Sequence, residues 1–82
     1  MKWSKEVNRY GRPVYRCRVP YGTGQLLVGS VVDYNPATPP YHALVRTPLI
    51  QDKWFEQLEE AKQYIVATYT LAVMDGDMKF PK

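Results

Sequence analysis

The hydrophobic pattern of the chain is most regular between residues 54 and 72. Apolar residues recur there at intervals of three and four, which places them on one stripe of a 3.6-residue repeat. The stripe consists of Trp54, Leu58, Ala61, Ile65, Tyr69 and Ala72. Asp52 is suited to cap the amino end of a helix, and Gly76 is suited to end it. The pattern therefore predicts one helix over about 53–74 and a tail over 75–82.

A second apolar stripe runs along the opposite face of the second half of this helix. It consists of Tyr64, Ala67, Leu71 and Met74. Because a helix that is apolar on all sides is normally covered on all sides, something should pack on this stripe. The tail residues Met78 and Phe80, a second copy of the chain, or a different protein partner would each serve. In a competing interpretation, 70–74 and 78–80 are two strands joined at Asp75-Gly76, because the segment is rich in β-branched residues.

The region before the helix alternates between apolar and polar positions, as half-buried strands do, because strand side chains switch face at every residue. A weak first strand covers 2–8, and Tyr10–Pro13 carries the residues of a turn. In the second strand, 14–19, the residues Tyr15, Cys17 and Val19 should face the helix. That arrangement leaves Arg16 and Arg18 on the open face of the sheet.

Two further strands follow a turn at Pro20–Gly24. In the strand 25–34, one face carries Leu26, Val28, Val32 and Tyr34, and the other carries Leu27, Val31 and Asp33. Gly29 permits a bulge or a close neighbour. A proline-rich connector, Asn35–Pro40, leads to a strand over 41–47, in which Tyr41, Ala43 and Val45 oppose His42, Leu44 and Arg46. The order predicts a single α+β domain over 1–82, with a three- to four-stranded antiparallel sheet packed on one C-terminal α-helix.

The net charge of +3 is unevenly distributed along the chain. Residues 1–20 carry six cationic residues against Glu6, whereas residues 52–82 carry four lysines against six acids. Such a split suggests a surface for a polyanion or for an acidic patch on a protein, and it also fits a solvated segment that has no partner. The longest apolar run, Tyr64–Met74, is much shorter than the roughly 20 residues that span a bilayer, so no membrane association is expected. The chain opens without the apolar core of a signal peptide and holds one cysteine, which indicates a cytoplasmic location.

The residues that catalysis requires are scarce in this chain. It holds one histidine and one cysteine, and the strand alternation points Cys17 to the core and His42 away from it. A Cys/His pair is therefore not expected, and zinc would lack ligands. The Gly22-Thr23-Gly24 turn lacks the lysine of a phosphate-binding loop. We expect no enzyme activity, no metal and no small-molecule cofactor.

The open sheet face is the stronger candidate for binding. Arg16, Arg18, His42 and Arg46 should share it, with Arg12 at the neighbouring turn. Arginines beside aromatic residues suit phosphate contact and base stacking, and a ribbon of strands can enter a major groove. A solvated face without a partner is the competing interpretation.

One stretch of sequence resembles known proteins. The strand pair Val14-Tyr15-Arg16-Cys17-Arg18-Val19 and Gly24-Gln25-Leu26-Leu27-Val28-Gly29, followed by the helix opening Phe55-Glu56-Gln57-Leu58-Glu59-Glu60-Ala61-Lys62, is similar to many small phage and prophage proteins of unassigned role. It also loosely resembles the arm-binding domains of tyrosine recombinases, which lack the Asn35–Pro40 loop and the extra strand. The phage-like resemblance implies a small accessory protein that acts by binding, in the cytoplasm of the host cell.

Two hypotheses about function follow. In the favoured one, the chain is a non-enzymatic accessory protein that acts by protein–protein interaction, as a homodimer or as an inhibitor of a host protein, through Tyr64, Ala67, Leu71 and Met74. In the alternative, it is a nucleic-acid-binding module that uses Arg12, Arg16, Arg18, His42 and Arg46. The first is favoured because an apolar stripe needs cover, whereas exposed arginines need no partner.

Overall fold

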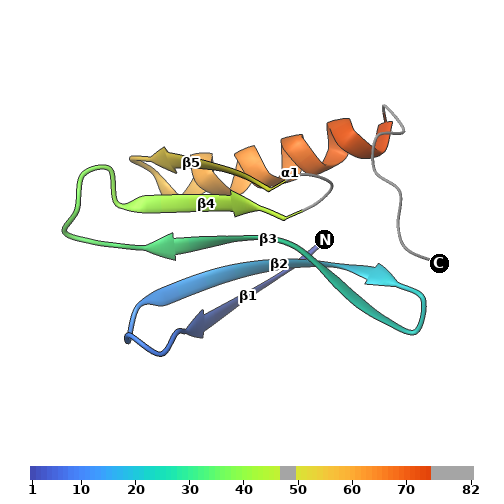
Figure 1. Cartoon of the computed structure of the whole chain (residues 1–82), viewed down its shortest axis with the longest axis horizontal. Helices are drawn as coiled ribbons and strands as arrows, with labels where there is room; N and C mark the ends of the chain where they lie inside the picture. Colours follow the sequence, from blue (N-terminus) through green and yellow to red (C-terminus); the bar gives the residue numbers. More distant parts are fainter. Residues whose placement is uncertain (47–49, 75–82) are drawn as a thin grey trace.

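The computed structural model describes residues 1–46 and 50–74. They form an α+β fold in which five antiparallel strands are followed by one helix (Figure 1). The elements are β1 (Lys2–Val7), β2 (Pro13–Tyr21), β3 (Gly24–Asp33), β4 (Tyr41–Val45), β5 (Gln51–Phe55) and α1 (Leu58–Met74). Each strand pairs with the next one along the chain, so the sheet order is β1-β2-β3-β4-β5. The predicted α+β class is confirmed, and the predicted three to four strands are corrected to five.

The fifth strand occupies the segment for which the sequence pattern predicts the start of the helix. Residues 51–55 pair with β4 in the register Tyr41 with Phe55 and Val45 with Gln51. The helix therefore begins at Leu58 and not near Lys53, and Asp52 is a strand residue and not a helix cap. The physical reason is that β4 has an open edge whose backbone groups the segment satisfies, which outweighs local helical spacing. The prediction that 70–74 could be a strand is also wrong, because these residues are helical.

The core lies between α1 and one face of the sheet. Its buried residues are Cys17, Val19, Val28, Val31, Ala43, Val45, Ala61 and Ile65, with Leu58 and Tyr69 packed against them. This confirms that the helical stripe from Leu58 to Tyr69 faces the sheet. Trp54 is the exception, because it belongs to β5. Within the described part of the chain, the backbone of α1 packs on β3, β4 and β5 and not on β1 or β2. On the face where it lies, the helix therefore covers the β3–β5 half of the sheet and leaves the β1–β2 half uncovered (Figure 1).

A bulge in β3 changes which of its side chains face the helix. Cys17 pairs with Gly29, but the next residue, Arg18, pairs with Leu27, so β3 holds one extra residue at Val28. As a result Val28 and Val31 are both in the core. Val32 pairs with Val14 and His42 on the opposite face. The prediction that Leu26, Val28, Val32 and Tyr34 share one face is therefore wrong for Val32 and Tyr34, which follow the bulge. The presence of Gly29 allowed for a bulge, but the effect of the bulge on the faces was not predicted.

Gly29 is also the point of closest approach between sheet and helix. A Cβ atom at this position would lie 2.7 Å from Ile65 Cγ2 and 2.7 Å from the backbone oxygen of Leu44. Only a glycine fits between these two neighbours, because real Cβ atoms do not approach heavy atoms so closely. The glycine thus lets α1 sit low on β3 and β4.

The connections confirm the turns that the sequence predicts. In the β1–β2 turn, Asn8 Oδ1 accepts hydrogen bonds from the backbone N–H groups of Tyr10 and Arg12, each at 3.0 Å, and Gly11 has a φ of 78°. The β3–β4 loop is closed by the Tyr34 N–H, which donates to the oxygen of Pro40 at 2.8 Å. Among the described residues, no helix is long and apolar enough to cross a bilayer. The predictions for Gly76, Met78 and Phe80 fall outside the described residues.

Candidate functional site

The sheet face turned away from α1 carries the candidate site, which we call the open face. The register joins Ser4, Arg16, Ser30, Leu44 and Asp52 in one cross-strand row, and Glu6, Val14, Val32, His42 and Trp54 in the next. A third row begins with Lys2, Arg18 and Leu27. Since paired residues share a face, the predicted placement of Arg16, Arg18 and His42 on one open surface is confirmed.

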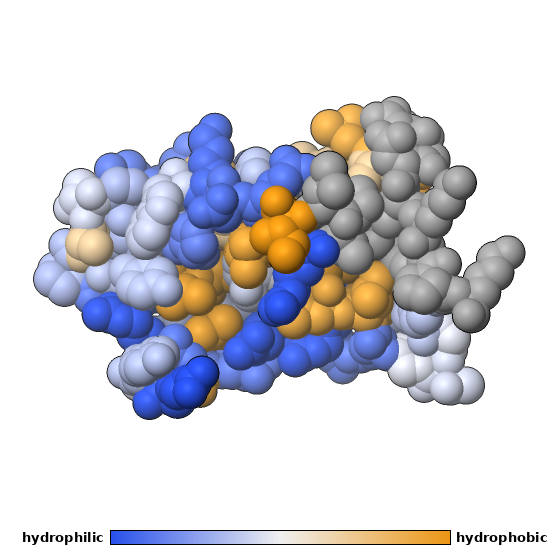
Figure 2. Space-filling view, in the orientation of Figure 1, coloured by the Kyte–Doolittle hydropathy of each residue, from blue (hydrophilic) through white to orange (hydrophobic). Residues whose placement is uncertain are grey.

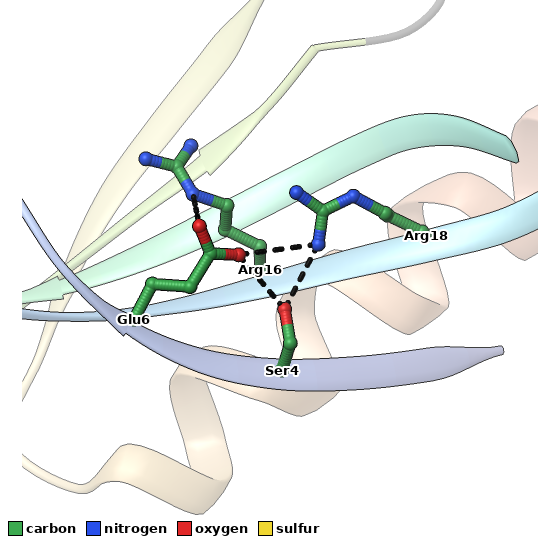
Figure 3. Close-up of polar contacts among 4 residues, drawn as sticks. All are labelled: Ser4, Glu6, Arg16 and Arg18. Carbon is green, nitrogen blue, oxygen red and sulfur yellow. Dashed lines mark hydrogen bonds and ion pairs between the residues drawn. The ribbon is translucent and has the colours of Figure 1, made fainter.

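Glu6 holds the two arginines of β2 in place. Its carboxylate lies 3.3 Å from Arg16 Nε and 3.2 Å from Arg18 Nη1 (Figure 3). Arg18 Nη1 also donates to Ser4 Oγ at 2.8 Å, and Ser4 Oγ donates to Glu6 Oε2 at 3.0 Å. The Ser4 hydrogen bond, then that of Arg18 and the positive charges of both arginines, hold the pKa of Glu6 below its ordinary value. In Figure 3 the terminal nitrogens of Arg16 point away from Glu6, and the Arg16 side chain is partly exposed.

Three aromatic rings gather at the other end of the open face. The ring of Trp54 lies 4.6 Å from that of His42 and 5.3 Å from that of Tyr34, centroid to centroid, in tilted arrangements. His42 Nε2 is 2.9 Å from Asp52 Oδ2, which holds the imidazole from the neighbouring strand. The guanidinium of Arg12 lies 5.0 Å over the ring of Tyr34, a cation–π geometry. Trp54 keeps 45% of its surface exposed.

The charge and polarity of the open face are mixed, with a cationic excess. Four cationic side chains, Lys2, Arg12, Arg16 and Arg18, are set against the carboxylates of Glu6 and Asp52. Val14, between the arginines and the rings, is only 3% exposed, so its neighbours close over it. Figure 2 likewise shows hydrophobic surface interrupted by hydrophilic residues. The face is thus a basic surface with aromatic groups and not a continuous apolar patch.

The sequence pattern identified only part of this surface. It placed Arg12, Arg16, Arg18 and His42 correctly; Arg46 is exposed and directly follows β4, and its N–H donates to Val28 O at 2.9 Å. It missed Trp54 and Asp52 because it assigned both to the helix, and it missed the role of Glu6. The alternation of Asp52 and Trp54 with Lys53 and Phe55 was the signal that could have revealed a strand.

The residues of the predicted helical stripe differ in their exposure. Tyr64 packs against the core, and its ring lies 5.4 Å from that of Phe55. Ala67 is exposed, Leu71 is 59% exposed, and the side chain of Met74 lies outside the described residues. A groove of 570 Å³ does run beside α1, over the side of the sheet that the helix leaves uncovered. Its lining residues are Trp3, Glu59, Lys62, Gln63, Val66, Ala67 and Thr70.

The single cysteine and the single histidine of the chain lie on opposite faces of the sheet. Cys17 is buried in the core, and burial raises the pKa of its thiol. His42 lies on the opposite face of the sheet, paired with Asp52. Among residues 1–46 and 50–74, no three His, Cys, Asp or Glu side chains gather in a group that could hold a metal ion.

The chain matches no protein-family model, and neither the curated proteins nor the solved structures with which it was compared gave a match. The assignment of function therefore starts from the geometry of the open face.

Proposed function

We propose that this chain is a small non-enzymatic binding protein whose open face binds nucleic acid. The observation that carries the proposal is the combination, on one sheet face, of the partly exposed side chains of Arg16 and Arg18 with an exposed tryptophan backed by two other rings. Phosphate contact and base stacking are the two interactions that such groups provide. The phage-type resemblance and the cytoplasmic location remain predictions from the sequence.

The arrangement of Arg16 and Arg18 supports phosphate binding beyond their charge. Each guanidinium is tied to Glu6, so its orientation is restricted before any ligand arrives. Arginine carries five N–H donors in a planar fork, and one or two contacts to Glu6 and Ser4 leave donors for a phosphate oxygen. Restricting a long side chain in advance lowers the entropy lost on binding. Arg12, stacked on Tyr34, is restricted in a similar way.

The test is binding of a labelled oligonucleotide, followed by fluorescence anisotropy at 50 and 200 mM salt. If three arginines contact phosphates, affinity should fall about 20- to 40-fold over this range, from a slope of roughly 0.7 to 0.9 per contact. The variant Arg16→Gln/Arg18→Gln should bind more weakly and show a slope near that of one contact. The matched control is Lys5→Gln/Lys53→Gln, which removes the same charge from the helix side of the sheet. Absence of binding at 50 mM salt, or equal losses in both variants, would remove the proposal.

A second candidate function, self-association, rests on the groove beside α1. Residues 63–74 contain no charged side chain, and Leu71 and Val73 are exposed at the end of the groove-lining helix. A five-stranded sheet is about 19 Å wide, whereas a packed helix takes 8–10 Å, so the uncovered side has room for one helix from a second copy. Sedimentation velocity at micromolar concentrations should show a dimer that Leu71→Glu dissociates, while Ile50→Glu, also at an exposed apolar residue, leaves it intact. If the wild-type chain stays monomeric at about 100 µM, the dissociation constant of any dimer is weaker than roughly 100 µM, and this candidate is excluded.

A further inference from the structure

We infer that the nucleic acid bound by the open face is single-stranded, with an unpaired base stacked on Trp54. This inference rests on the proposed function and narrows it to one class of ligand. It comes from the width of the sheet, the composition of its projecting hairpin and the position of the Trp54 ring.

The basic part of the sheet does not fit the major groove of a duplex. Five strands have four spacings of about 4.8 Å, which gives a width near 19 Å, whereas the groove is about 12 Å wide. A two-stranded ribbon would fit, and β2 and β3 do extend as a pair beyond the other strands (Figure 1). That extension, residues 19–27, contains no charged residue. Arg16 therefore lies in a row of five paired strands, which is too wide for the groove, and the narrow ribbon beyond Arg18 carries no guanidinium group.

Trp54 is placed to stack with a base. It lies on the edge strand β5, with His42 and Tyr34 against it, and 45% of its surface remains exposed. The hydrogen bond between His42 and Asp52 fixes the imidazole ring that packs against Trp54. The faces of a base within a duplex are covered by its neighbours, so an exposed protein ring reaches them only in a single strand or at an end.

The distance between the rings and the arginines suits a short single strand. Trp54 is three strands away from Arg16 in the sheet order, which corresponds to about 14 Å across the sheet. Arg12 lies beside Tyr34 at the same end as Trp54. A nucleic-acid strand that crosses the open face from the rings to Arg16 and Arg18 would occupy a site of only a few nucleotides, near the lower end of the range of about 4 to 16 nucleotides that OB folds bind.

The experiment compares three ligands of equal length on the full chain at one salt concentration. They are a ten-nucleotide single strand of mixed sequence, the same sequence as a blunt duplex, and a single strand whose four central bases are replaced by abasic sites. The intact single strand should bind at least tenfold more tightly than the duplex. Stacking of one base predicts a loss of about 5- to 140-fold for the abasic strand.

Protein variants connect this loss to one ring. Trp54→Ala should lose a similar factor on the intact strand, with the salt dependence unchanged, and should lose little more on the abasic strand. Trp54→Phe should retain part of the affinity. The control is Trp3→Phe, which lies on the groove side of the sheet, should bind normally, and leaves Trp54 as the single tryptophan reporter, whose fluorescence the stacked base should quench.

The outcomes separate this inference from the proposed function. Salt-dependent binding that is equal for the single strand, the duplex and the abasic strand would overturn the inference and leave the proposed function intact. If the wild-type chain binds none of the three ligands at low salt, both the inference and the proposed function are overturned. The wild-type comparison between intact and abasic strands does not depend on the folding of any variant.

Discussion

The substitution Gly29→Ala tests how closely α1 is seated on the sheet. The added Cβ would lie 2.7 Å from Ile65 Cγ2, 2.7 Å from Leu44 O and 3.3 Å from Ile65 Cδ1. A flexible side chain could move away from such a contact, but Leu44 O belongs to the backbone of β4, which is held between β3 and β5. Relief would therefore require a shift of the strand or of the helix.

The expected cost follows from these contacts. Overpacking of a core typically costs about 1–3 kcal/mol, and a contact with backbone puts this site toward the upper end. Replacing glycine by alanine in a strand would otherwise gain about 0.5–1 kcal/mol. The expected net loss is thus about 2 kcal/mol. A chain of this length has a total stability of about 4–12 kcal/mol, so the loss is a large part of it.

Urea denaturation followed by circular dichroism measures the effect. With an m-value of about 1 kcal/mol/M, the midpoint of Gly29→Ala should fall by about 2 M. The matched control is Gly24→Ala, where the added Cβ meets only Tyr21 O at 3.9 Å, and its midpoint should not fall. Adding Ile65→Leu, which removes Cγ2 at nearly constant volume, should recover part of the loss in the double variant. A midpoint for Gly29→Ala equal to that of the control would refute the close seating of the helix.

Three further results are expected. Because the pKa of Glu6 is lowered in the fold, its stabilising effect is present above the ordinary glutamate pKa of about 4.3 and is lost as pH falls through the lower folded value; the stability difference between wild type and Glu6→Gln should therefore shrink between pH 7 and pH 3 in urea titrations, and a pH-independent difference would contradict this. The Cys17 thiol, fully buried and with a raised pKa, should react with a soluble thiol reagent at the rate of global unfolding, whereas fast labelling of the native protein would show that the core opens locally. Gly22 has a φ of 58° with no heavy atom near an added Cβ, so Gly22→Ala should cost about 1 kcal/mol through the backbone alone and Gly22→Asn should cost less; equal costs would argue against the left-handed turn.

The sequence pattern predicted the faces of β2 and β4 correctly because both strands alternate without interruption. Tyr15, Cys17 and Arg16 lie where period two puts them. In β3 the same reasoning failed after Gly29, since one extra residue at Val28 exchanges the faces of everything that follows. A glycine signals that a bulge can occur, but the partner strand decides whether it does.

The start of the helix was mistaken for a similar reason. Trp54 stands four residues before Leu58, so it fits the helical stripe, and it also fits a strand in which it alternates with Phe55. The edge of β4, which would be unpaired without residues 51–55, decides between the helix and the strand. This is a tertiary feature that no local stretch of sequence contains. The consequence for function is direct, because the strand moves Trp54 from the core to the open face and brings Asp52 to His42.

The carboxylates change the meaning of the basic surface. Counted as charges, Glu6 and Asp52 weaken a site for polyanions, and exposed ion pairs of this kind contribute little to stability. In the fold, however, each carboxylate lies beside a group that the proposed site uses: Glu6 beside both arginines of β2, and Asp52 beside His42 under Trp54. The carboxylates reduce the net positive charge of the face, but they also fix the orientation of the side chains beside them. A long side chain that is already immobilised loses less entropy when a ligand binds. Such a surface should distinguish among anions by shape more than by charge, which is the behaviour that a site for single strands requires.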